Sequence, residues 1–289
     1  MAEHGTLPSR ILTDNQLRQL DALGYLHLPG LFTPSEVAQL SRVHNRLIGK
    51  IEQRRPLAAG ESAGAGPLLL VPDFLPFFDD DRICGLAEEI IGADSVVAPT
   101  LVWAVLQGHA NGWHADGQLP ALPGLKISIF LDEVGPDDGC LTVLPGSHQA
   151  QSSAAYRQAF LAGALPSDQR SIPGAVSLPS RPGDLQVFWR PLWHSTWSPP
   201  RRRRQIHLSF YGRPPYPAYD DAMWHYLLKL PGCQDLLWTA GYRLFSEHFI
   251  GTAGDRRLRK VQAYLDAGFG DPRRPAPTEE QLVLSRDTV

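Results

Sequence analysis

Two residue types that commonly bind metal ions, His114 and Asp116, are separated by one position in the stretch Trp-His-Ala-Asp-Gly at 113–117. In an extended backbone, side chains at positions i and i+2 point to the same face, so these two groups would converge on one small volume. His194, which follows an apolar strand pattern, offers a third ligand. Two histidines and one carboxylate on one face of a metal, with open positions opposite, indicate a non-haem Fe(II) oxygenase centre.

The composition limits the partners that this site can serve. The 289 residues carry a formal net charge of −3, which gives no reason to expect nucleic acid as a partner. The three cysteines form no metal-binding spacing, and their odd number argues against a disulfide framework, so we expect a cytoplasmic protein. No apolar run approaches the roughly 18 residues that span a bilayer, and we expect no membrane partner. The sequence does not specify an oligomeric state.

The residues around these ligands follow a β pattern. Short apolar or alternating runs are separated by Gly- and Pro-containing turns; they cover 96–106, 126–131, 140–144, 185–189 and 205–211. This texture predicts a sandwich or closed barrel, of which a double-sheet jelly roll is one solution. Helical spacing flanks the strands; it predicts helices from Thr13 to Leu23 with a capping box, from Thr33 to Leu47, and from Leu86 to Ile91. Residues 150–180 are expected to form an inserted helix and loop over the sheet mouth.

We expect a single domain in four segments. These are an N-terminal helical scaffold, a jelly-roll core, C-terminal helices and a tail, at 1–95, 96–213, 214–270 and 271–289.

Further motifs accompany the triad in a fixed order. The opening Leu23–Phe32 reads Leu-Gly-Tyr-Leu-His-Leu-Pro-Gly-Leu-Phe, and Asp137–His148 ends in Pro-Gly-Ser-His. Over roughly Leu12 to Arg213 this set resembles the phytanoyl-CoA dioxygenase family of Fe(II)- and 2-oxoglutarate-dependent oxygenases. The resemblance implies a mainly β fold with flanking helices, the double-stranded β-helix (jelly roll, cupin-like). It also implies that iron is bound by His114, Asp116 and His194, with 2-oxoglutarate and O2 as co-substrates.

A 2-oxoglutarate enzyme needs a cation for the distal carboxylate, and arginine binds carboxylate bidentately while staying charged when buried. Four consecutive arginines occupy 201–204. Strand alternation places Arg204 with Ile206 and Leu208 on the apolar face, which we expect to point into the barrel, so Arg204 is the predicted ligand. The family usually spaces this arginine one residue further from the distal histidine, so a shortened turn after His194 must absorb the difference. Arg203 or a shifted register is therefore the alternative. His207 is expected to face away from Arg204.

Weaker candidates complete the predicted site. The resemblance implies that Thr196, two residues after His194, helps to bind 2-oxoglutarate, and that Gln107 faces this co-substrate. Trp113 and His109 are candidates for contact with the substrate, which we expect to be a small molecule.

The predicted reaction is hydroxylation of a C–H bond in a small organic molecule of secondary metabolism, with release of succinate and CO2. The same cofactors acting on an acyl-CoA, or in desaturation, epimerisation or cyclisation, are alternatives. The Asp116 carboxylate argues against halogenation, because related halogenases carry a small residue there. A zinc hydrolase and a non-catalytic metal-dependent binding protein are the alternatives from other classes.

Overall fold

The computed structural model describes the chain with gaps; the described residues are 10–54, 62–65, 72–97, 101–105, 111–116, 124–165, 172–197, 203–212, 245–266, 271–275 and 283–285. Among these residues, no helix is both long and apolar enough to cross a membrane.

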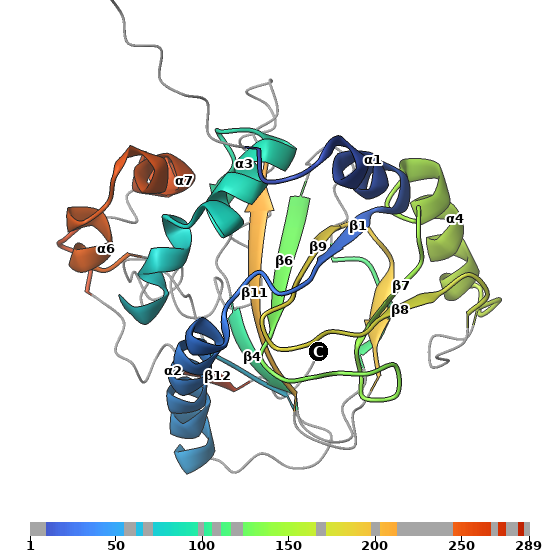
Figure 1. The fold of residues 1–289 in the computed structure, drawn as a ribbon, viewed down its shortest axis with the longest axis horizontal. Helices are drawn as coiled ribbons and strands as arrows, with labels where there is room; N and C mark the ends of the chain where they lie inside the picture. Colours follow the sequence, from blue (N-terminus) through green and yellow to red (C-terminus); the bar gives the residue numbers. More distant parts are fainter. Residues whose placement is uncertain are drawn as a thin grey trace, which may run out of the picture.

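Two antiparallel sheets form the centre of the fold (Figure 1). The larger sheet has the order β1 (Tyr25–Leu28), β9 (Leu185–Trp189), β6 (Gly124–Phe130), β11 (Arg203–Tyr211), β4 (Leu101–Val105), β2 (Ser62–Ala65) and β12 (Val283–Ser285), with β3 (Val96–Val97) on β11. The smaller sheet has the order β5 (Asn111–His114), β10 (His194–Thr196), β7 (Leu141–Val143) and β8 (Val176–Leu178). This arrangement confirms the predicted jelly roll with flanking helices. The larger sheet also includes β1, where the alternation of Tyr25–Leu28 predicts a brief strand, and β2, both from the 1–95 segment that was expected to be a mainly helical scaffold.

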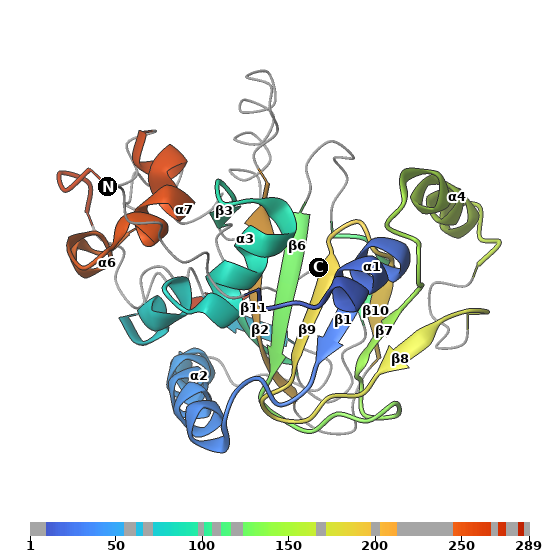
Figure 2. The ribbon, with the colours of Figure 1, turned by 45° about the horizontal axis from the view of Figure 1, so that its top comes forward.

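The helices divide between the two sides of this core (Figure 2). The outer side of the larger sheet carries α2 (Pro34–Arg54), α3 (Leu86–Ile91), α6 (Glu247–Gly251) and α7 (Asp255–Asp266), with the short helices η2 (Pro72–Phe78) and η3 (Asp81–Gly85). Helix α1 (Asp14–Leu23) has the predicted capping box, in which the side chains of Thr13 and Gln16 each bond the other's backbone N–H. Helix α4 (Ala150–Leu161) lies beside the smaller sheet.

The central strands of the larger sheet have one apolar and one polar face. Ile127, Ile129, Leu208 and Phe210 are fully buried in the main hydrophobic core, which the outer helices share. The opposite face of β6 and β11 carries polar side chains, since Lys126 pairs with Ser209 and Ser128 with His207 across the two strands. A second cluster, including Phe130 and Phe188 of the larger sheet and Leu141 and Val143 of the smaller one, packs between the sheets. The polar face therefore points into the space between the sheets.

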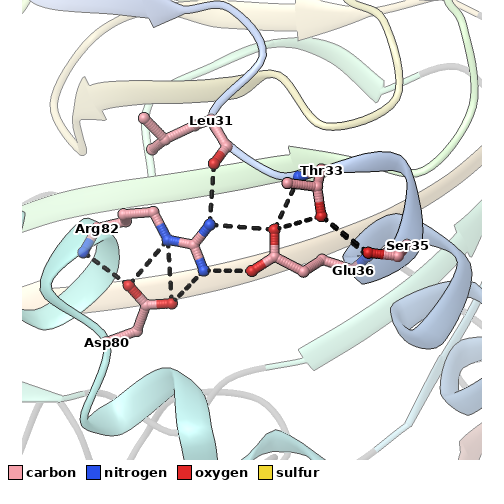
Figure 3. A network of polar contacts seen from close by, with 6 residues as sticks. All are labelled: Leu31, Thr33, Ser35, Glu36, Asp80 and Arg82. Atoms are coloured by element: carbon pink, nitrogen blue, oxygen red, sulfur yellow. Dashed lines mark hydrogen bonds and ion pairs between the residues drawn. The ribbon is translucent and has the colours of Figure 1, made fainter.

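A polar network fastens the start of α2 to η3 (Figure 3). The guanidinium of Arg82 donates to the carboxylates of Glu36 and Asp80 at 2.7 and 2.6 Å, and to the carbonyl oxygen of Leu31 at 2.9 Å. Glu36 also accepts from the Thr33 backbone N–H at 2.7 Å. Hydrogen bonds from Arg82 and Thr33 lower the pKa of Glu36 to about 2. The network fixes the helix that covers one end of the larger sheet.

Candidate metal centre

The three predicted ligands come together at one end of the space between the sheets. The residues His114 and His194 are paired across β5 and β10, and their ring centroids are 4.3 Å apart. One donor atom from each of His114, Asp116 and His194 can be chosen so that all lie within 4.8 Å of one another. Nε2 of His114 is 3.6 Å from Asp116 Oδ1, and Nε2 of His194 is 3.9 Å from Oδ2.

Backbone carbonyls fix the tautomer of both histidines. Nδ1 of His114 lies 2.7 Å from the carbonyl oxygen of Gly112, and Nδ1 of His194 lies 2.8 Å from that of Leu192. Because a carbonyl oxygen only accepts, each Nδ1 carries the proton. Each Nε2 then presents a lone pair to the space shared with the Asp116 carboxylate. Burial, followed by the neighbouring His114, lowers the pKa of His194 to about 3, so this ring stays neutral at physiological pH. The donor set fits a divalent transition metal.

The Asp116 carboxylate is held by two cations of the larger sheet. Lys126 of β6 donates to Oδ2 at 2.7 Å, and Nη1 of Arg190, just after β9, lies 4.0 Å from the same oxygen. The Arg190 side chain also donates to the backbone carbonyl oxygen of Asp116 at 3.0 Å, and the Asp116 N–H donates to the Arg190 carbonyl oxygen at 3.0 Å. Burial would raise the pKa of Asp116, but the positive charges of Lys126 and Arg190 hold it well below its ordinary value. The carboxylate is therefore ionised and available as a ligand.

The predicted face of Arg204 is wrong. The apolar face that Arg204 shares with Ile206 and Leu208 packs against the outer helices, and Arg204 forms an ion pair with Asp132, with Nη2 2.6 Å from Oδ1. Arg203, the alternative, lies on the inner face and is 2% exposed. Its guanidinium lies 5.9 Å from the ring centroid of Phe130 and donates to the carbonyl oxygen of Gly139.

The structure places only some of the remaining sequence candidates on the side of the metal ligands. Thr196 lies on β10 two residues after His194, so its side chain is on the same side of the strand as the ligand. The structure does not bring Trp113 to the donor atoms, because its indole packs with Trp193 in a cluster on the other side of β5 and β10. Gln107 and His109 lie outside the described residues.

Four inner-face residues were missing from the prediction or undervalued in it: Lys126, Arg190, Arg203 and His207. His207 lies inside, with Nδ1 2.7 Å from Ser128 Oγ, and burial holds its pKa well below the ordinary value. The signal was present in the alternation of Lys126 and Ser128 with Ile127 and Ile129. A polar face on a central strand, covered on both sides, must line either a site or internal water.

Comparison with known proteins agrees with this geometry. A jelly roll that brings two histidines and a carboxylate to one end of the barrel defines the class of non-haem Fe(II), 2-oxoglutarate-dependent oxygenases. Residues 20–198 match the family described as "Phytanoyl-CoA dioxygenase (PhyH)", and the chain belongs to that family. The family that the sequence motifs resemble is thereby confirmed.

The similar proteins cover different shares of the chain. The ectoine dioxygenase of Streptomyces coelicolor is 29% identical over 149 residues, which are 46% of this chain and 50% of the relative. The chain thus spans about half the length of the curated relatives that it matches. Among solved structures, HygX from Streptomyces hygroscopicus with nickel and 2-oxoglutarate bound is similar with a TM-score of 0.59 and 18% identity, covering 71% of this chain and 88% of HygX. The epimerase SnoN from nogalamycin biosynthesis has a TM-score of 0.53 and 21% identity, covering 76% and 89%. These likenesses show the fold.

Proposed function

We propose that this protein hydroxylates a C–H bond of a small organic molecule of secondary metabolism. In this reaction one O2 and one 2-oxoglutarate are consumed, one oxygen atom enters the substrate C–H bond, and the other enters succinate as CO2 is lost. The observation that carries the proposal is the convergence of two Nε2 lone pairs and an ionised carboxylate at one end of a polar space between the sheets.

In this proposal His114, Asp116 and His194 hold the iron, which when bound supplies the redox chemistry that activates O2. Three protein ligands leave three coordination positions, enough for two oxygen atoms of 2-oxoglutarate and for O2. The carbonyl bonds at Nδ1 keep both imidazoles oriented with Nε2 toward the metal position. Thr196 stays a candidate for contact with 2-oxoglutarate.

We assign the distal carboxylate of 2-oxoglutarate to Arg203 in place of Arg204. Arg203 Nε is buried without a hydrogen-bond partner among the described residues, which is costly for a cation. A carboxylate bound by the guanidinium fork would satisfy this atom and neutralise the charge. Burial lowers the pKa of Arg203 to about 10, so the side chain remains a cation at neutral pH.

The names of similar proteins support a small-molecule substrate. The curated relatives are ectoine dioxygenases, and HygX has been solved with hygromycin B bound. Two other structural neighbours are named as a carbocyclase and an epimerase, so this fold also serves reactions other than hydroxylation. Hydroxylation is proposed here because the sequence relatives are dioxygenases.

The test is anaerobic addition of Fe(II) and 2-oxoglutarate, read as the visible metal-to-ligand charge-transfer band. We expect the band in the wild type, its loss in His114→Ala, and its weakening in Arg203→Met. Succinate release then serves to screen substrates. A folded protein that binds iron but shows no band would contradict the proposed function.

A further inference from the structure

The three donor residues are supported by different sheets. His114 and His194 belong to paired strands of the smaller sheet, whereas Asp116 follows the end of β5 and is fastened to the larger sheet. Lys126 of β6 makes the short contact to the carboxylate, at 2.7 Å from Oδ2. On the other side of the same carboxylate, Oδ1 lies 3.6 Å from Nε2 of His114. Oδ1 therefore faces His114, whereas Oδ2 engages the Lys126 ammonium group and lies 3.9 Å from Nε2 of His194.

We propose that Lys126 keeps Asp116 a one-oxygen ligand and so reserves coordination positions for 2-oxoglutarate and O2. This inference rests on the proposed function of the site. A carboxylate can bind a cation through one oxygen or through both. Two histidines, two Asp116 oxygens and two 2-oxoglutarate oxygens would fill all six positions of an octahedral ion, leaving none for O2. With Oδ2 held by Lys126, one position stays open.

Lys126 is placed for this role by its strand. It lies on the inner face of β6 opposite Ser209 of β11, and its Nζ is 5.7 Å from the ring centroid of Phe188. Its ammonium is a compact charge that repels a metal approaching Oδ2.

Arg190 has a different task at the same residue. Its Nη2 donates to the backbone carbonyl oxygen of Asp116 at 3.0 Å, and its own carbonyl oxygen accepts from the Asp116 N–H. Its Nη1 is 4.0 Å from Oδ2, beyond hydrogen-bond distance. Arg190 thus places the backbone of Asp116, and Lys126 directs the carboxylate.

Loss of Lys126 should therefore affect the binding of the metal and the binding of 2-oxoglutarate in opposite ways. Without Lys126, both Asp116 oxygens become available, and a repulsive charge is lost, so the metal alone binds at least as tightly. 2-Oxoglutarate then loses the attraction of a nearby cation, and its two oxygens would have to take the last two positions, which leaves none for O2. A side chain that only tethers Asp116 would behave differently, because its loss would weaken binding of the metal itself, typically by about 10- to 100-fold.

The experiment is calorimetric titration of the whole protein with Ni(II), followed by titration of the Ni(II)-loaded protein with 2-oxoglutarate. In Lys126→Met we expect the Kd for 2-oxoglutarate to rise about 10-fold or more, while the Kd for Ni(II) does not rise. Lys126→Arg retains the charge and the donor, and both constants should stay near those of the wild type. Thermal unfolding without metal checks that each variant is folded, and Lys126→Gln replaces Lys126→Met if that variant is not.

A weaker affinity for Ni(II) in the variant would overturn the proposal and leave Lys126 as a tether. So would an unchanged affinity for 2-oxoglutarate. Failure of the proposed function is distinguishable, because the Ni(II)-loaded wild type would then bind no 2-oxoglutarate.

Discussion

The ring of Phe160, near the end of α4, stacks on the indole of Trp193, with centroids 4.6 Å apart and planes inclined by 18°. Trp193 immediately precedes His194, and neighbouring residues of a strand point to opposite faces, so this stack supports β10 from behind the donor atom. Phe160 also stacks on Trp113, the residue before His114, at 6.4 Å and 22°. The Phe160 side chain of α4 thus packs behind both strands that carry the ligand histidines.

Phe160→Ala should therefore weaken both the fold and the metal centre. Loss of two stacked contacts and of apolar burial should lower the free energy of unfolding by about 2 kcal/mol, and looser histidines should raise the Kd for Ni(II). The neighbouring Leu161 is 83% exposed, and Leu161→Ala should change neither value beyond about 0.5 kcal/mol. Urea unfolding and Ni(II) titration measure both effects. Equal effects of the two substitutions would contradict this role of Phe160.

Substitutions of Arg203 and of Arg204 should have different effects on the Kd for 2-oxoglutarate. Arg203→Met removes the inner guanidinium and should raise the Kd for 2-oxoglutarate at least about 10-fold in Ni(II)-loaded protein. Arg204→Met removes an outer ion pair with Asp132, so it should leave that Kd unchanged and lower stability by no more than about 1 kcal/mol. Calorimetric titration of both variants is the measurement. The reverse order of effects would return the assignment to Arg204.

The difference between these two arginines shows where the sequence-based prediction of the inner face of β11 failed. The spacing of His114 and Asp116 and the position of His194 predicted the triad, because i and i+2 share a face of any extended segment. The apolar face of β11 was expected to point into the barrel, as it would in a sandwich that has an apolar core and solvent-exposed outer faces. Here helices cover the outer face and the enclosed face is polar, so the same alternation with Ile206 and Leu208 has the opposite meaning.

Lys126 was missed for the same reason. The alternation in Lys-Ile-Ser-Ile, at 126–129, predicted a strand but no role for its polar positions, which lie on the inner face. Only pairing with β11, where Ser209 and His207 lie opposite Lys126 and Ser128, reveals a polar face shared by two central strands. Such pairing joins residues about eighty positions apart in the chain, so the local alternation showed a polar face but not that this face is enclosed.

The acid sensitivity of the fold should include a contribution from His148. Burial lowers the pKa of this ring below 6.5, and its Nε2 lies 3.0 Å from the carbonyl oxygen of Asp21, to which it donates. The folded protein thus stays neutral at His148 where the unfolded chain takes up a proton. Below pH 6.5 unfolding binds a proton, so the free energy of unfolding falls as the pH falls towards the lowered pKa, by at most about 1.4 kcal/mol per pH unit.

His148→Gln keeps a donor for Asp21 but does not titrate, so it isolates this contribution. Urea unfolding of the metal-free wild type and variant between about pH 7 and pH 5 should show the stability of the wild type falling relative to that of the variant. A constant difference across the range would show that His148 titrates alike in both states.

Gly24 should tolerate substitution far less well than Gly30, although both have positive φ. Gly24 ends α1 at φ 87°, and a Cβ there would lie 2.5 Å from Nδ1 of His148 and 2.7 Å from Cδ1 of Leu192. Gly30, at φ 64°, has nothing within 4 Å of such an atom. Gly30→Ala should therefore cost only the left-handed backbone conformation, about 1–2 kcal/mol. Gly24→Ala should cost about 1–3 kcal/mol more, because His148 and Leu192 must move. Equal unfolding midpoints for the two variants would contradict the close packing of α1 on the Pro-Gly-Ser-His turn.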